Sequence, residues 1–230
     1  MNSIRACVIV FPGTNCDRDT HFALSKIMDI PTDFVWHDFD EVLDYDIVVL
    51  PGGFSYGDYI RTGVFARFSP VMKSVEKYVL EERGLIIGIC NGFQILTEAG
   101  LLPGALTRNT STRFICDTVE INVENFQTPF TRSVTKKNLK LPIAHSDGNY
   151  RISEKELEKL KAQNRIVFRY VENPNGSVED IAGVCSENFR ILGMMPHPER
   201  AACSVLRNTD GVEIFKSMVD YLRSEKIARS

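Results

Sequence analysis

The first half of the chain alternates short apolar runs with amphipathic stretches. The runs at residues 6–11, 47–50 and 85–89 are continuous and apolar, as is typical of strands buried inside a parallel sheet, and residues 32–36 form a fourth candidate strand. Helical stretches are expected at residues 17–28, 64–82 and 92–99, and the middle one places these residues on one face: Val64, Phe65, Phe68, Val71, Met72, Val75 and Val79. This alternation predicts a parallel sheet with helices on both faces.

The second half has a different pattern. Residues 114–123 alternate between apolar and polar side chains, which predicts a half-exposed strand. Candidate strands at 165–171 and 181–185 flank the turn signal Asn173-Pro174-Asn175-Gly176, and a short apolar strand follows at 191–194. These segments predict a mostly antiparallel extension of the same sheet.

Two further helices complete the predicted fold. Ser153 and Glu156 have the spacing of a capping box that opens a charged helix ending near residue 163, and residues 211–227 form a closing helix. The sequence contains no low-complexity linker and no internal repeat, so a single domain over residues 1–230 is expected. The expected class is α/β, with a three-layer arrangement.

Composition and charge narrow the class of protein. Hydrophobic residues make up 43% and charged residues 25% of the chain, and the net charge is -3, which is ordinary for a globular protein and gives no basic surface for nucleic acid. The apolar run at residues 6–11 is too short for a signal-peptide core, and no segment reaches the length that spans a bilayer. We therefore expect a cytoplasmic protein without nucleic acid or membrane as partner.

The cysteines show neither a metal nor a disulfide pattern. The chain has 6 of them, none in a Cys-x-x-Cys pair, and their spacing fits neither a zinc site nor a disulfide framework. Most are expected to be small buried side chains, and we expect no bound metal. A catalytic role for any one of them requires local evidence.

Such evidence surrounds Cys90. The segment Gly88-Ile89-Cys90-Asn91-Gly92 has the Gly-x-nucleophile-x-Gly form of a nucleophile elbow, between a predicted strand and a predicted helix. The helix dipole favours a thiolate at this position, and the Asn91 N–H can donate to an oxyanion. The alternative is that Cys90 merely ends a core strand and the glycines allow close packing.

A second candidate group is Met195-Pro196-His197-Pro198-Glu199, which follows the strand at 191–194. Glu199 can orient the imidazole of His197 or stabilise its charged form, and the two prolines stiffen the loop. Cys90, His197 and Glu199 together supply a nucleophile, a base and an orienting acid. The alternative for His197 and Glu199 alone is an ordinary surface pair.

The third group is the turn Pro51-Gly52-Gly53 after a buried strand. Its glycines allow a backbone N–H to face a pocket, and Gly53 is the candidate for a second oxyanion donor beside Asn91. They also permit a peptide flip, which a partner pressing on Phe54 and Tyr56 could bias. The alternative is a flexible loop. Because ligands bind beyond the carboxyl ends of parallel strands, the turns at 12–13, 51–53 and 88–92 locate one site.

Together these groups resemble the class I, or triad, glutamine amidotransferases. The Gly-x-Cys-x-Gly-x-Gln pattern is met by Gly88, Cys90, Gly92 and Gln94, with the Pro-Gly-Gly turn before it and His-x-Glu after it. The chain is most similar to the glutaminase subunits of phosphoribosylformylglycinamidine synthases, through Phe11 to Asp17, Gly52 to Asp58, Cys90 to Gln94 and Asn173 to Ser177. One departure is Ser146-Asp147, where those subunits more usually have Gly-Glu.

The resemblance implies a flavodoxin-like glutaminase domain that hydrolyses glutamine at Cys90 and supplies ammonia to a separate synthase subunit. Gln94 is the side chain expected to touch glutamine, and Asn109, Ser111 and Arg113 follow on the next loop and strand. For these last three a polar turn is the alternative interpretation. No cofactor is expected in this chain, whereas ATP and magnesium are expected on the synthase, which a small accessory subunit would accompany.

Three alternatives stay open. A glutaminase for another pathway, such as CTP, GMP, pyridoxal phosphate or histidine synthesis, would carry the same three groups. A cysteine hydrolase or chaperone of the related Cys-elbow superfamily would place its histidine directly after the cysteine, where this chain has Asn91. A degenerate regulatory subunit would be expected to have lost Cys90, His197 or Glu199, and all three are present.

Overall fold

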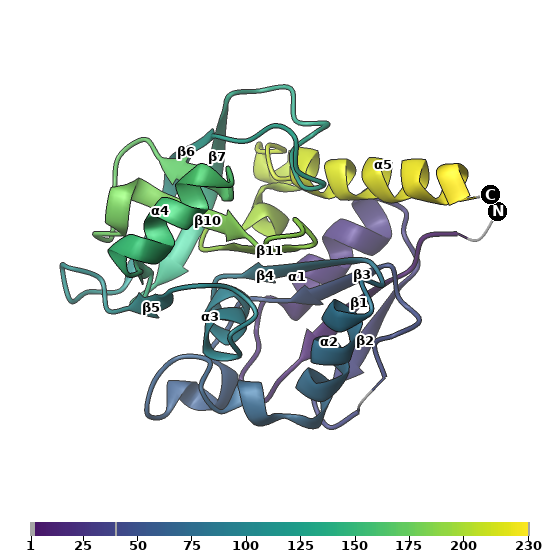
Figure 1. Ribbon diagram of the computed structural model, residues 1–230, viewed down its shortest axis with the longest axis horizontal. Helices are drawn as coiled ribbons and strands as arrows, with labels where there is room; N and C mark the ends of the chain where they lie inside the picture. Colours follow the sequence, from purple (N-terminus) through teal and green to yellow (C-terminus); the bar gives the residue numbers. More distant parts are fainter. Residues whose placement is uncertain (1–2, 40, 230) are drawn as a thin grey trace.

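The computed structural model describes residues 3–39 and 41–229 and shows a mixed sheet with helices on both faces (Figure 1). The strands are β1 (Ala6–Val10), β2 (Thr32–Trp36), β3 (Ile47–Leu50), β4 (Leu85–Ile89), β5 (Ala105–Thr107), β6 (Ile115–Val123), β7 (Asn138–His145), β8 (Asn149–Arg151), β9 (Ile166–Tyr170), β10 (Ile181–Cys185) and β11 (Ile191–Met194). The α-helices are α1 (Asp17–Phe22), α2 (Pro70–Leu80), α3 (Asn91–Glu98), α4 (Glu154–Ala162) and α5 (Val212–Arg229). A turn of π-helix at Ala23–Ile27 continues α1.

The main sheet has the order β2-β1-β3-β4-β11-β10-β9-β6-β7 among the described residues. Strands from β2 to β11 run parallel to their neighbours, and the pairs from β11 to β7 are antiparallel. This confirms the predicted parallel sheet with an antiparallel extension. A second sheet of two strands, β5 and β8, was not predicted.

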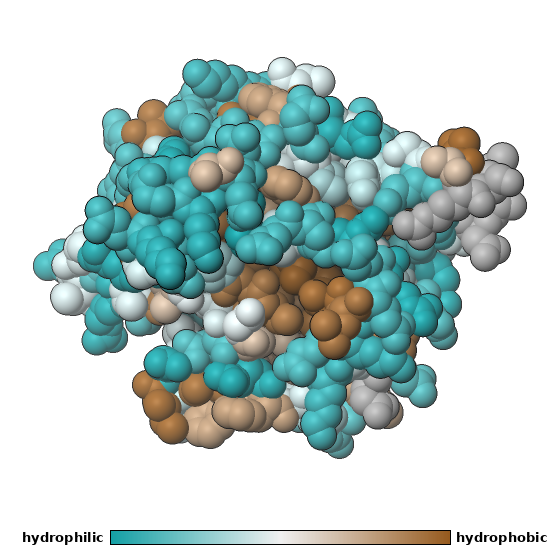
Figure 2. Space-filling model, viewed as in Figure 1, coloured by the Kyte–Doolittle hydropathy of each residue, from teal (hydrophilic) through white to brown (hydrophobic). Residues whose placement is uncertain are grey.

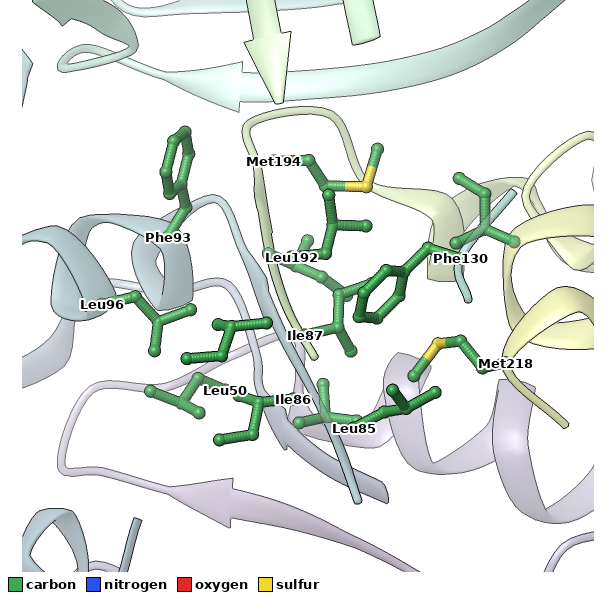
Figure 3. Close-up of a cluster of buried hydrophobic side chains, with 14 of the residues drawn as sticks. Leu50, Leu85, Ile86, Ile87, Phe93, Leu96, Phe130, Leu192, Met194 and Met218 are labelled. Carbon is green, nitrogen blue, oxygen red and sulfur yellow. The ribbon is translucent and has the colours of Figure 1, made fainter. Parts of the chain in front are cut away.

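The core lies on both faces of the central strands. All five residues of β4 are buried, which explains why its sequence is continuously apolar rather than alternating. In Figure 1, α2 and α3 cover one face of the sheet, and α1 and α5 cover the other. Figure 3 shows Phe93 and Leu96 of α3 on one side of the strands, with Phe130 and Met218 on the other.

The predicted helix at 64–82 is wrong in its first part. The helix α2 begins only at Pro70, and residues 66–68 form a short 3-10 turn instead. Proline fits the first position of a helix, and it holds Ser69 before it in an extended conformation (φ -63°, ψ 145°). As a result Phe65 and Phe68, which were predicted to lie on the buried face, are 42% and 71% exposed.

The strand β7 was missed, although a signal for it exists. Its buried residues alternate along the chain as Leu139, Leu141, Ile143 and His145. Pro142 would interrupt the hydrogen bonding of an inner strand, but β7 is at the edge of the sheet, where a missing N–H is tolerated. The strand matters because it carries Ala144 and His145 toward Cys90.

The surface in Figure 2 is mostly hydrophilic, with an apolar area at the lower edge where Figure 1 shows the segment between β3 and α2. Large exposed apolar side chains in this segment are Phe54, Tyr59, Ile60, Phe65 and Phe68. Within the described parts of the chain, none of the helices combines the length and the apolar character that crossing a membrane requires.

Candidate active site

The candidate residues converge at the carboxyl ends of neighbouring parallel strands. Strand β11 lies beside β4 in the sheet, with Met194 opposite Ile89, so that the segments leading to Cys90 and to His197 leave the sheet side by side. The Cys90 N–H donates to the Met194 carbonyl at 2.8 Å. The topology therefore brings together two residues that are far apart in the sequence.

Cys90 occupies the predicted elbow. Its backbone has φ 50° and ψ -103°, a conformation that is unfavourable for a residue with a side chain and is typical of a nucleophile on a strained turn. A Cβ at Gly88 would lie 2.7 Å from the backbone of Gly92, and a Cβ at Gly92 would overlap the Leu50 carbonyl. The two glycines are therefore required by close packing as well as by the turn.

His197 and Glu199 form a buried hydrogen-bonded pair. The Nδ1–H of His197 donates to Oε1 of Glu199 at 2.6 Å, and the two residues are 1% and 4% exposed. Nε2 of His197 has no hydrogen-bond partner among the described residues. Since Nδ1 carries the proton that Glu199 accepts, Nε2 remains available for proton transfer on the side of the thiols.

Two thiols lie beside this imidazole. Burial disfavours a charged His197, but the Glu199 carboxylate together with Cys90 and Cys16 raises the pKa of His197 well above its ordinary value. The Sγ of Cys16 accepts a hydrogen bond from the Arg200 guanidinium at 3.0 Å. Cys16 is buried after β1, and sequence reasoning gave it no role.

The two predicted oxyanion donors border the same space. The Gly52 carbonyl accepts a hydrogen bond from the Cys16 N–H at 3.1 Å, and because a trans peptide points its C=O and N–H in opposite directions, the Gly53 N–H is directed away from Cys16. Gly53 and Cys90 line one cavity. Asn91 is the first residue of α3, where a backbone N–H has no partner within the helix.

The side chain of Asn91 links three parts of the site. Its Oδ1 accepts from the Ser55 N–H at 3.1 Å, and its Nδ2 donates to Oε1 of Gln94 at 2.9 Å. The Nε2 of Gln94 in turn donates to the Asp147 carbonyl at 2.7 Å. This chain of bonds holds the turn after β3 and the loop after β7 around Cys90.

The cavity beside Cys90 is small. Its lining residues are Gly53, Phe54, Asp58, Thr62, Cys90, Gln94, Ala144, His145, Ser146 and Asp147, and water has access to about 10 Å³ of it. A cavity of this size holds about one water molecule. A larger open cavity of about 300 Å³ is lined in part by Leu101, Lys159 and Arg165 and by no cysteine or histidine.

The chain that carries Cys90, His197 and Glu199 matches a known family. The profile of the CobB/CobQ-like glutamine amidotransferase domain matches residues 3–222. The chain belongs to this family. In this amidotransferase the elbow and the Pro-Gly-Gly turn border one cavity through Cys90 and Gly53, and His197 lies against Gly52 behind it.

Individual relatives agree with the family. The phosphoribosylformylglycinamidine synthase subunit PurQ of Koribacter versatilis (strain Ellin345) is 52% identical over 222 residues, covering 92% of this chain and 96% of the relative. A chain in the structure of PurLQS from Thermotoga maritima is 43% identical, with a TM-score of 0.87 and coverage of 96% of this chain and 100% of that chain. The fold predicted from the resemblance is thereby confirmed.

A more distant structure shares the fold alone. A glutamine amidotransferase from Thermotoga maritima is 16% identical and superimposes with a TM-score of 0.58 over 100% of this chain and 86% of that chain. The three-layer architecture is thus shared at a sequence identity too low to carry details of the site.

The amidotransferase site also holds a set of donor atoms of the type that bind metals. One atom each of Cys16, His197 and Glu199 lies within 4.8 Å of the others, and all three residues are buried. The expectation that the chain binds no metal stays a prediction.

Of the predicted glutamine-binding residues, the structure places Gln94 at the cavity and the other three away from it. Gln94 lines the cavity, but both ends of its amide are engaged within the protein. Asn109 is buried and donates to the carbonyls of Arg113 and His145, so it organises the loop from behind. Ser111 and Arg113 are exposed and do not line the cavity. Their role in positioning glutamine stays a prediction.

Three further residues of the site were given no role by the sequence: Asp58, His145 and Asp147, which all line the cavity. Burial and the nearby Asp147 raise the pKa of Asp58 to about 6. Burial and the nearby His197 lower the pKa of His145 to about 4, so that its imidazole is neutral near pH 7. The alternation of buried and more exposed residues along β7 is the sequence feature that could have indicated a buried His145.

Proposed function

We propose that this chain is the glutaminase subunit of a phosphoribosylformylglycinamidine synthase. It hydrolyses glutamine to glutamate and ammonia, and the ammonia passes to a synthase subunit that converts formylglycinamide ribonucleotide to formylglycinamidine ribonucleotide with ATP. The observation that carries the proposal is the buried Cys90, His197 and Glu199 group in a chain 52% identical to a PurQ subunit.

The proposed chemistry uses these residues in turn. The Cys90 thiolate attacks the side-chain amide carbon of glutamine, and the N–H groups of Gly53 and Asn91 stabilise the oxyanion that forms. His197, oriented by Glu199, gives a proton to the departing ammonia as the C–N bond breaks. It then takes a proton from water, which attacks the thioester and releases glutamate, and Cys90 is restored.

The partners are part of the proposal. The chain would act with the synthase subunit and a small accessory subunit, and ATP with magnesium would bind on the synthase. The structure of PurLQS, in which a similar chain is found, supports such an assembly. We place this complex in the cytoplasm. A glutaminase for another pathway remains the alternative, and the nucleotide substrate used in the assay separates the two.

The test replaces Cys90 by alanine in the complex with the synthase. We expect Cys90→Ala to lose glutamine hydrolysis while the complex still makes the amidine from added ammonium salt, because only the source of ammonia is removed. Cys116→Ala is the matched control, since it removes an exposed thiol on β6. Glutamine hydrolysis by Cys90→Ala would refute the assignment, and failure of the active wild-type complex on formylglycinamide ribonucleotide would favour another pathway.

A further inference from the structure

The cavity beside Cys90 is lined by three side chains that accept hydrogen bonds, and two of them have a buried atom without a donor. Asp58 comes from the segment after β3, and His145 and Asp147 come from the end of β7 and the loop that follows. Oδ1 of Asp58 is buried without a hydrogen-bond partner, and so is Nε2 of His145. A buried acceptor without a donor is costly, so a group of them beside a nucleophile points to a ligand that brings the donors.

The two carboxylates also lack a counter-charge. No lysine or arginine within the described residues forms an ion pair with Asp58 or Asp147. Their mutual repulsion adds to burial in raising the pKa of Asp58. A bound cation would relieve this repulsion.

His145 adds a neutral acceptor with a defined tautomer. The amide nitrogen of Asn109 donates to two carbonyls, which leaves its Oδ1 to accept from Nδ1 of His145 at 3.1 Å. Nδ1 of His145 therefore carries the proton and Nε2 carries a lone pair. The ring is only 3% exposed, so this lone pair is shielded from water.

We propose that Asp58 and Asp147, together with Nε2 of His145, bind the α-ammonium group of the substrate glutamine. The inference rests on the proposed function and adds the residues that select the amino acid. An ammonium group has three N–H donors and one positive charge, which match two carboxylates and a neutral imidazole. In glutamine this group is three carbons from the reacting amide carbon, so it reaches a wall of the cavity that contains Cys90.

This assignment gives the loop after β7 a role in binding the substrate, through Asp147. Asp147 directly follows Ser146 in this loop. The Ser146 hydroxyl donates to Oδ2 of Asp147 at 2.8 Å, and the Asp147 carbonyl is held by Gln94. The Asp147 side chain is thus fixed in place rather than left to rotate freely.

The test compares two substrates in the wild-type complex and in Asp58→Asn and Asp147→Asn. One substrate is L-glutamine, and the other is its desamino analogue glutaramate, which keeps the amide and the carboxylate but lacks the ammonium. We expect each variant to lower kcat/KM for glutamine by about 10- to 100-fold, mainly through KM. For glutaramate the same variants should change kcat/KM by less than about threefold, because the lost charge has no partner on that substrate.

Asp44→Asn is the matched control, since it removes an exposed carboxylate just before β3, at the end opposite to Cys90. A direct binding measurement, titration of L-glutamine into the Cys90→Ala complex with and without Asp58→Asn, should show the same loss of affinity. Equal losses of kcat/KM for both substrates would overturn the inference while leaving the glutaminase assignment intact. A wild-type complex that hydrolyses no glutamine would instead overturn the proposed function.

Discussion

Gly52 lies directly against the imidazole of His197. A Cβ on Gly52 would lie 2.7 Å from Cε1 of His197 and 3.0 Å from Sγ of Cys16, closer than carbon and sulfur atoms approach. The turn after β3 therefore sets the position of His197 as well as carrying Gly53, the predicted oxyanion donor. A side chain at this position would push His197 out of line with Cys90.

Gly52→Ala should reduce the rate as well as the stability. A displacement of His197 by a few tenths of an ångström to 1 Å is expected to lower kcat by about 100-fold, whereas the extra methyl destabilises by about 1–3 kcal/mol. Steady-state glutaminase assays and thermal unfolding measure the two effects. Gly100→Ala is the contrasting control, because Gly100 has φ +71° and nothing within 4 Å, so stability should fall and kcat should not.

His197→Ala should be nearly as damaging as the loss of Cys90, because nucleophile and base act as a unit. Glu199→Gln should be milder, since a hydrogen bond to Nδ1 can persist while the charge is lost. Because the Glu199 carboxylate raises the pKa of His197, this variant should also shift the pKa of His197 downward in the pH profile of glutamine hydrolysis. If Glu199→Gln lowers activity more than His197→Ala does, the roles assigned to these two residues are wrong.

The parts of the site that the sequence predicted are those encoded locally. The elbow at Cys90 follows from five consecutive residues, and the pair of His197 and Glu199 lies two residues apart, so each is visible in a short window. The parallel strands were equally clear, because burial on both faces makes them continuously apolar.

The parts that were missed depend on contacts between distant segments. Cys16 accepts a hydrogen bond from Arg200, which is 184 positions away along the chain. His145 is oriented by Asn109, which is 36 positions away. The prediction of a helix beginning at Val64 was wrong for a local reason. The apolar spacing continues across Pro70, but proline marks a helix start. Apolar spacing alone cannot distinguish a buried face from an exposed one, as Phe68 shows.

Asp58→Asn should make the isolated chain more stable near pH 7. The unfolded carboxyl loses its proton near pH 3.8, whereas in the folded chain the pKa is about 6, so the folded state binds more protons in between and its stability falls as pH rises across that window. Since Asp58 is only half-buried, solvent reduces the gain to about 1 kcal/mol, or about 2–4 °C in Tm.

Thermal unfolding of wild type and Asp58→Asn from pH 4 to pH 8 measures this difference. The gain in Tm should be full above about pH 6 and should shrink as pH falls toward 3.8, where the carboxyl of the unfolded chain also becomes protonated. Asp44→Asn, which removes an exposed carboxylate, is the control for the loss of one negative charge. A stabilisation by Asp58→Asn that is equally large at pH 4 would mean that charge repulsion is not its cause.

The purified chain alone should be a poor glutaminase that its synthase activates. The space beside Cys90 admits only about one water, so we expect the wall formed by Phe54, Asp58 and Thr62 to move when glutamine enters. A flip of the Gly52–Gly53 peptide, the switch expected from the sequence, would break the bond from the Cys16 N–H to the Gly52 carbonyl. Movement of residues 58–62 in the segment after β3 would leave this bond intact.

The backbone and the surface of that segment fit such a movement. Ile60 has φ 70°, an unfavourable value for a β-branched residue, and the side chains of Tyr59 and Ile60 are 73% and 86% exposed. A synthase that contacts these two side chains could shift the segment toward an open state, and a shift of a few kcal/mol raises the rate by about a hundredfold. Steady-state glutaminase assays with and without the synthase and its nucleotide substrates measure this activation.

Tyr59→Ser with Ile60→Ser should weaken the activation by at least about tenfold and leave the low rate of the chain alone unchanged, because exposed apolar contacts contribute only when the partner is bound. Leu80→Ser is the matched control, since Leu80 is 84% exposed at the end of α2, outside the segment after β3. If the purified chain alone turns over glutamine as fast as the complex, the segment opens without help and the gating idea is wrong. The chemistry proposed for Cys90 would be unaffected by that result, because it depends on His197 and Glu199 rather than on how glutamine enters.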